Sequence, residues 1–142
     1  MNIAFFLKPK NEIAYLYDDY TLRQGLEKMK HHGYTAIPVI NKDGCYVTTI
    51  SEGDFLWYIL KDAEPGTDIR EIPMESLEEK YIKDLMHVDK NPPVYITATV
   101  EELVERAMEQ NFIPVIDDSG SFIGIITRRN LLESFAKQGN KV

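Results

Sequence analysis

The chain has 142 residues, of which 44% are hydrophobic and 27% charged, with 8 Gly and 7 Pro. This composition excludes a disordered or collagen-like chain, and the length suits one globular domain with a buried core. Because 16 Lys and Arg stand against 23 Asp and Glu, the net charge is −7. A duplex nucleic-acid binder needs a basic face, so we expect no nucleic-acid partner.

The sequence also bears on where the protein works. Its longest apolar runs, 55–60 and 122–126, are far shorter than the roughly 18–20 residues that span a bilayer. The first ten residues, MNIAFFLKPK, lack the basic start and the long apolar run of a secretory signal peptide. A single cysteine cannot form an internal disulfide. We therefore expect a soluble, cytoplasmic protein with no membrane partner.

The first half of the chain predicts two helices and three short strands. An apolar stretch at 14–17 predicts a strand, and Thr21-x-x-Gln24 predicts the capping box of an amphipathic helix. Two short apolar strands follow, joined by a four-residue hairpin loop at 41–44. A second helix is predicted over 54–61.

Residues 62–88 form the connection to the second half. The stretch 62–68 predicts a polar turn, and Ser76-x-x-Glu79 predicts the capping box of a linker helix over 76–86. Leu85-Met86 lies 79 residues after Phe6-Leu7. We interpret both pairs as lead-in elements, with which each half docks on the other.

The second half repeats the first. It predicts a strand over 94–97, a helix opened by Thr99-x-x-Glu102, a hairpin loop at 117–120 and a helix over 130–137. The quartet Ile-Pro-Val-Ile occurs at 37–40 and again at 113–116, an offset of 76 residues that upstream becomes 78. The change of two residues falls at Thr35-Ala36, which the second copy lacks.

The chain therefore contains two copies of one β-α-β-β-α unit. We predict an α/β (α+β) fold in which the two units pack sheet to sheet, because a unit of about 50 residues leaves one sheet face uncovered. The predicted boundaries are a first repeat with its lead-in at 1–62, a linker with a helix at 63–88 and a second repeat at 89–142.

This pattern resembles a tandem CBS-domain pair, or Bateman module, of the stand-alone bacterial kind. The resemblance rests on the apolar-Pro-Val strand, the hairpin and the motif Gly-apolar-apolar-[Ser/Thr]-x-x-[Asp/Asn]. Residues 124–130 (GIITRRN) match this motif in full, and 48–54 (TTISEGD) match it except that Thr48 replaces the glycine. The resemblance implies an adenine-containing ligand in clefts between the copies: AMP, ADP, ATP, S-adenosylmethionine or cyclic di-AMP, which some similar proteins of Gram-positive bacteria bind.

Two motif segments supply candidate ligand contacts. Ser51-x-x-Asp54 and Thr127-x-x-Asn130 have the spacing of a helix cap, and a helix N-terminus also presents N–H groups to an anion. The resemblance implies that Asp54 and Asn130 contact ribose, and that Ser51 and Thr127 contact phosphate. Ile126, which precedes Thr127, is also a candidate ligand contact. Arg128-Arg129 are either solvated or phosphate ligands.

A third candidate segment distinguishes the two copies. The resemblance implies that Thr35 and Ala36 line an adenine pocket, with Ala14 and Tyr15 on the opposite strand and Pro38 at its floor. Plain core packing is the alternative for Tyr15. The second copy has only Asn111-Phe112 at this place. Our hypothesis is therefore one competent nucleotide site and one that is degraded or differently shaped.

The sequence contains no catalytic constellation. Its three histidines and Cys45 do not have zinc-ligand spacing, and it has no P-loop. We expect no enzymatic activity, no metal and no cofactor. The leading hypothesis is a regulatory module that senses an adenine nucleotide, and the alternative is a ligand-free oligomerisation or partner-docking module. The resemblance further implies a homodimer formed through the second helices and a protein target of unknown identity.

Overall fold

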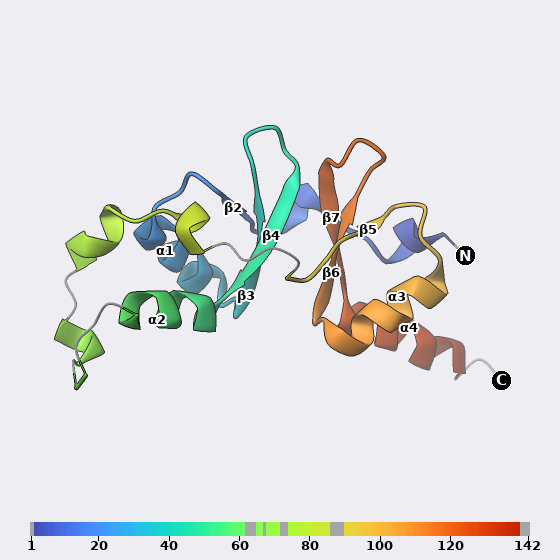
Figure 1. The fold of residues 1–142 in the computed structure, drawn as a ribbon. Coiled ribbons are helices and arrows are strands. Elements are labelled where there is room, and N and C mark those ends of the chain that lie inside the picture. Colours follow the sequence, from blue (N-terminus) through green and yellow to red (C-terminus); the bar gives the residue numbers. More distant parts are fainter. Residues whose placement is uncertain (1, 62–64, 67, 72–73, 86–89, 140–142) are drawn as a thin grey trace. The chain divides into compact units, whose positions relative to one another are not determined.

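The computed structural model describes residues 2–61, 65–66, 68–71, 74–85 and 90–139. The first copy contains β2 (Leu16–Tyr17), α1 (Leu22–His32), β3 (Ala36–Ile40), β4 (Tyr46–Ser51) and α2 (Glu52–Leu60). The second contains β5 (Val94–Tyr95), α3 (Val100–Glu109), β6 (Phe112–Ile116), β7 (Phe122–Thr127) and α4 (Arg128–Gly139). The predicted two-copy α+β fold is confirmed (Figure 1). Strands β2 and β5 are shorter than predicted, and α2 and α4 each begin two residues earlier.

The chain divides into two compact units that do not coincide with the two repeats. The first-repeat unit contains Ala14–Asp43 and Val47–Lys90. The second-repeat unit contains Met1–Ile13, Gly44–Tyr46 and Asn91–Val142. The N-terminal segment therefore belongs structurally with the second repeat. No helix in the described parts of the chain is long and apolar enough to cross a membrane.

The first repeat builds a three-stranded sheet in the order β2-β3-β4, with α1 and α2 on one side of it (Figure 1). Strand β2 is parallel to β3, with Leu16 opposite Val39. Helix α1 begins with the predicted capping box, in which the Thr21 hydroxyl accepts from the Gln24 N–H and the Gln24 side chain accepts from the Thr21 N–H. It ends at Gly33, whose left-handed φ of 69° turns the chain toward β3.

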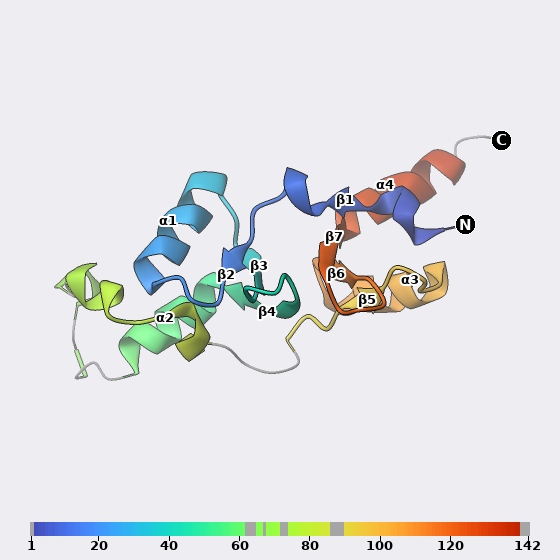
Figure 2. The same ribbon diagram turned by 90° about the horizontal axis from the view of Figure 1, so that it is seen from above.

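The second repeat repeats this pairing and adds a strand. Its sheet has the order β1-β7-β6-β5. Strand β5 is parallel to β6, with Val94 opposite Val115. These two residues lie 78 and 76 positions after Leu16 and Val39, so the pairing is the same as in the first sheet. The added strand, β1 (Lys8–Pro9), lies antiparallel beside β7 (Figure 2).

Each repeat is completed by the segment that precedes the other repeat in the sequence. Ile3 and Phe6 pack into the core of the second repeat, and Ile82 and Leu85 pack into the core of the first. Ile3 and Ile82 are both fully buried. The predicted lead-in role is confirmed for Phe6 and Leu85, whereas Met86 lies outside the described residues.

The linker helix predicted over 76–86 is wrong. The described residues form two separate 3-10 helices instead, Met74–Glu78 and Ile82–Leu85. The intervening backbone bonds to the loop before α1: the Leu22 N–H donates to the Lys80 carbonyl (2.9 Å), and the Ile82 N–H donates to the Tyr20 carbonyl (2.8 Å). Groups used in these bonds cannot also close a helix. The polar turn predicted at 62–68 lies partly outside the described residues.

Candidate functional site

The first candidate segment sits where β4 ends and α2 begins. The Ser51 N–H donates to Asp54 Oδ2 (2.8 Å), and the Ser51 hydroxyl donates to the same oxygen (3.1 Å) while it accepts from the Asp54 N–H (3.4 Å). These bonds form the capping box that the spacing predicts. They also fix a carboxylate and a hydroxyl at the positive end of a helix dipole.

A lysine that the sequence analysis missed joins this pair. Lys90 Nζ donates to Ser51 Oγ (3.0 Å) and forms an ion pair with Asp54 Oδ2. Lys90 is separated from Asp54 by 36 residues and lies outside every predicted helix and strand, so no spacing pattern signals this contact. The Asp54 side chain is 15% exposed and that of Lys90 34% exposed, so water screens the pair only partly.

The Asp54 carboxylate is held in its ionised form. Desolvation by itself raises the pKa of Asp54, but the hydrogen bonds from Lys90 and Ser51, together with the Lys90 charge, outweigh it and hold that pKa below its ordinary value. Within the described residues, every hydrogen bond to this side chain goes to Oδ2. Oδ1 therefore remains available as an acceptor for a ligand hydroxyl.

The segment before β3 lies beside this cluster. The Glu52 N–H at the start of α2 donates to the Thr35 carbonyl (2.9 Å). The structure therefore brings together three of the predicted site residues: Thr35, Ser51 and Asp54. A cavity of about 300 Å³ adjoins the same segment, lined by Leu26, Met29, Lys30, Gly33, Tyr34 and Glu52.

The remaining predicted residues of the first repeat differ in accessibility. Ala14 and Pro38 are buried, so their side chains belong to the interior, whereas Ala36 is half-buried and Thr35 exposed. Tyr15 packs edge-to-face against Tyr17, with the Lys28 ammonium 5.1 Å from the Tyr15 ring centroid. Burial, followed by the Tyr17 hydrogen bond, raises the pKa of Tyr15 above its ordinary value.

The corresponding segment of the second repeat has the same backbone geometry and different side chains. Thr127 Oγ1 accepts from the Asn130 N–H (3.1 Å), and the Arg128 N–H donates to the Asn111 carbonyl (2.9 Å). Arg128 Nε also donates to the Ala107 carbonyl near the end of α3 (2.6 Å). Because a cation is favourable at a helix C-terminus, this contact accounts for the position of Arg128 without an anion.

Two other predicted site residues of the second repeat, Arg129 and Ile126, have contacts that need no ligand. Arg129 forms an exposed ion pair with Glu133, one helical turn further along α4 (3.0 Å). Ile126 is fully buried in the core of the second repeat, so its side chain cannot reach a ligand.

The side chain of Gln110 has contacts that bear on the hypothesis of two unlike sites. Its side chain is buried, and its Nε2 donates to the carbonyls of Pro92 (3.4 Å) and Phe112 (3.3 Å). At the repeat offsets of 78 and 76, Pro92 corresponds to Ala14 and Phe112 to Ala36, the predicted walls of the first-repeat pocket. In the second repeat, the Gln110 amide therefore already bonds to the two backbone carbonyls at the position of the predicted pocket walls. The prediction that the second copy lacks Thr35-Ala36 is wrong: β3 and β6 begin at equivalent residues, so the two-residue difference falls earlier, where α1 ends.

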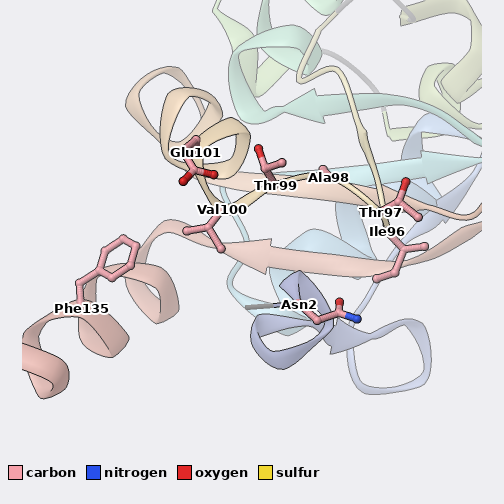
Figure 3. Close-up of a pocket in the computed structure, with 8 residues that line it drawn as sticks. All are labelled: Asn2, Ile96, Thr97, Ala98, Thr99, Val100, Glu101 and Phe135. Carbon is pink, nitrogen blue, oxygen red and sulfur yellow. The ribbon is translucent and has the colours of Figure 1, made fainter.

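A larger cavity, of about 750 Å³, lies elsewhere in the second-repeat unit (Figure 3). It is lined by Asn2, Ile96, Thr97, Ala98, Thr99, Val100, Glu101 and Phe135. No predicted site residue lines it, and its charged lining residue is the acid Glu101, which opposes phosphate. Thr99 already caps α3 by accepting from the Glu102 N–H (3.2 Å). Within the described residues, no group of three or more His, Cys, Asp or Glu could hold a metal.

Comparisons with known proteins agree with the fold. The model of the CBS domain family matches residues 7–61 and 82–137. An uncharacterized protein of Methanocaldococcus jannaschii is 27% identical over an alignment that covers 84% of this chain and 83% of the relative.

Two solved structures extend the likeness over both repeats. A hypothetical conserved protein from Geobacillus kaustophilus is 27% identical, with a TM-score of 0.83 over 97% of this chain and 98% of the other. The CbpB protein of Listeria monocytogenes, solved in complex with c-di-AMP, is 25% identical, with a TM-score of 0.81 over 97% of each chain.

Proposed function

The chain belongs to the CBS domain family, and from this premise we propose that it is a regulatory module that binds an adenine nucleotide. The observation that carries the proposal is the cluster of Thr35, Ser51, Asp54 and Lys90 at the start of α2. The Listeria monocytogenes CbpB protein, whose fold this chain shares, was solved with c-di-AMP, which supports a ligand of this class.

The chemistry of the cluster suits a nucleotide. Asp54 is ionised, and its Oδ1 accepts a ribose hydroxyl in the proposed complex. The Ser51 hydroxyl, the Lys90 ammonium and the N-terminal end of α2 favour a phosphate. The half-buried Ala36 and the backbone around Thr35 form the side against which the base packs.

We place the competent site in the first repeat. Asn130 of the second repeat carries an amide where the first has a carboxylate, and a neutral amide oxygen is a weaker acceptor for hydroxyls. Gln110 moreover occupies the carbonyls of Pro92 and Phe112. Thr127, Arg128 and Arg129 remain proposed phosphate contacts of the second, differently shaped site, with Arg129 the more exposed of the two arginines.

The proposed role is regulatory and not catalytic. A bound nucleotide carries information only if two conformations of the protein bind it with different affinity. Exposed apolar residues on the second helix of each repeat suit a homodimer or a protein target. Among them are Trp57, 71% exposed, and Leu132, 59% exposed. The same residues favour the alternative function, a docking module that needs no ligand.

A thermal-shift panel with AMP, ATP, c-di-AMP, S-adenosylmethionine and GMP tests the proposal. A ligand at about 100 times its dissociation constant adds roughly 2.7 kcal/mol, which raises the melting midpoint by several degrees. We expect a shift with at least one adenine compound and none with GMP. Asp54→Ala should abolish the shift, and Asn130→Ala, the matched change in the second repeat, should retain it. No shift with any adenine compound would favour the docking module.

A further inference from the structure

The start of α2 lacks the positive charge that the start of α4 carries. Its first turn contains Glu52 and Asp54, both acidic. At the offset of 76 residues, Arg128 stands in place of Glu52, and Arg129 in place of Gly53. A phosphate that approaches α2 therefore meets two carboxylates, which the roughly half-unit charge of the helix dipole does not balance.

Lys90 supplies the missing charge from outside the motif. Its ammonium bonds to Ser51 Oγ, the side chain that caps the helix, and pairs with Asp54. Within the described residues, no other Lys or Arg pairs with Glu52 or Asp54. Lys90 thus brings to the start of α2 a positive charge of the kind that the start of α4 carries in its own sequence.

We infer that Lys90 is the residue that makes the first-repeat site select nucleotides over nucleosides, a role that rests on the proposed function. In the bound state, Asp54 accepts the ribose hydroxyls and the Lys90 ammonium contacts the phosphate. The lysine has a flexible four-carbon stem, so its head group can turn from Asp54 to a neighbouring phosphate without movement of the backbone. A nucleoside uses only the first of these contacts, and a nucleotide uses both.

Titration calorimetry with adenosine, AMP and c-di-AMP tests this inference on the full chain. Lys90→Ala is expected to weaken the binding of AMP or c-di-AMP by about tenfold or more, since a charge-assisted hydrogen bond is lost. Adenosine affinity should change by less than about threefold. Lys90→Gln keeps hydrogen-bonding capacity without charge, and it should behave like Lys90→Ala toward the phosphate ligands.

Lys83→Ala is the matched control, because it removes one positive charge from the same connecting segment at a side chain that lies over Tyr81. It should leave all three affinities unchanged. The salt dependence of AMP binding should also be weaker in Lys90→Ala than in wild type, since one charge contact is gone.

The possible failures are distinguishable. If wild type binds phosphate ligands and Lys90→Ala binds them equally well, the role of Lys90 is overturned and the proposed function stands. The role is also overturned if adenosine and AMP weaken by the same factor, because Lys90 then only positions Asp54. If wild type binds none of the three compounds, the proposed function itself fails, and the role of Lys90 fails with it. Melting midpoints of the ligand-free variants show whether each remains folded.

Discussion

Gly124 on β7 lies so close to Lys8 on β1 that a Cβ at Gly124 would stand 2.2 Å from the Lys8 carbonyl oxygen. The glycine of the motif is therefore required by the pairing of β1 with β7, in which Pro9 is opposite Gly124. The corresponding Thr48, 2% exposed, lies on β4, which ends the β2-β3-β4 strand order. Among the described residues, no strand pairs with the far side of β4, and a threonine side chain stands there in place of the glycine that the second repeat needs.

Gly124→Ala is expected to lower the free energy of unfolding by more than about 2 kcal/mol, because the backbone of β1 must move to relieve the collision. Gly53→Ala is the control. Its added Cβ would have its nearest neighbour at 3.7 Å, so we expect a change within about 1 kcal/mol, toward greater stability. Urea denaturation of both variants measures the difference. Equal effects would mean that β1 does not pair with β7 in solution.

Neighbouring phenylalanines provide a second test of the N-terminal segment. Phe6 is 5% exposed and Phe5 is 76% exposed. Phe6→Ala should cost about 3–5 kcal/mol through the cavity it leaves in the core of the second repeat. Phe5→Ala should remain within about 0.5 kcal/mol of wild type. Chemical denaturation that shows similar losses for both would contradict the packing of Phe6 against the second repeat.

The ion pair of Asp54 predicts a pH dependence of stability. The pKa of Asp54 is lower in the folded protein than in the unfolded chain, so its stabilising contribution is present above the unfolded value of about 3.9. It is lost as the pH falls from there through the folded pKa. The difference in unfolding free energy between wild type and Asp54→Asn should therefore shrink as pH falls below about 4. A difference that stays constant from pH 7 to pH 3 would exclude this role of the Asp54 charge.

The two repeats should also differ in ligand binding. Titration of wild type with whichever nucleotide binds is expected to give no more than one high-affinity site per chain, because the Gln110 amide bonds to the carbonyls of Pro92 and Phe112 in the second repeat. Asn130→Ala should leave the number of sites unchanged and the affinity within about threefold. Two sites of equal affinity per chain would disprove the asymmetry.

Local patterns predicted most of the fold. The repeat offsets predict two equivalent units, and the structure shows the equivalence in the strand register, with Leu16 opposite Val39 and Val94 opposite Val115. The spacing of Ser51 and Asp54 predicted the cap at the start of α2. These features depend on residues that lie close in sequence or that recur at a fixed interval. Both kinds of pattern can be recognised in a single sequence.

The linker helix and the two contacts that the sequence did not signal involve partners distant in sequence. Ser76-x-x-Glu79 has the spacing of a helix start, but the backbone that follows it bonds to the loop before α1. Lys90 reaches Asp54 across 36 residues, and Gln110 reaches Pro92 across 18. No short pattern specifies contacts of this kind, because tertiary packing selects them. The set of ligand contacts in both repeats remains a prediction.

The exchange of lead-in segments has a consequence for how the protein is made. The first-repeat unit is almost continuous in sequence and ends at Lys90, so it can assemble while the rest of the chain is still on the ribosome. The second-repeat unit needs β1, synthesised first, and β7, synthesised near the end. Ile3 and Phe6 therefore stay exposed until the core residues of the second repeat have been synthesised. Contacts between residues so distant in sequence form slowly. For the same reason, a cut at the predicted end of the first repeat, between residues 62 and 63, would not yield two independent halves, since each fragment would carry the segment that completes the other.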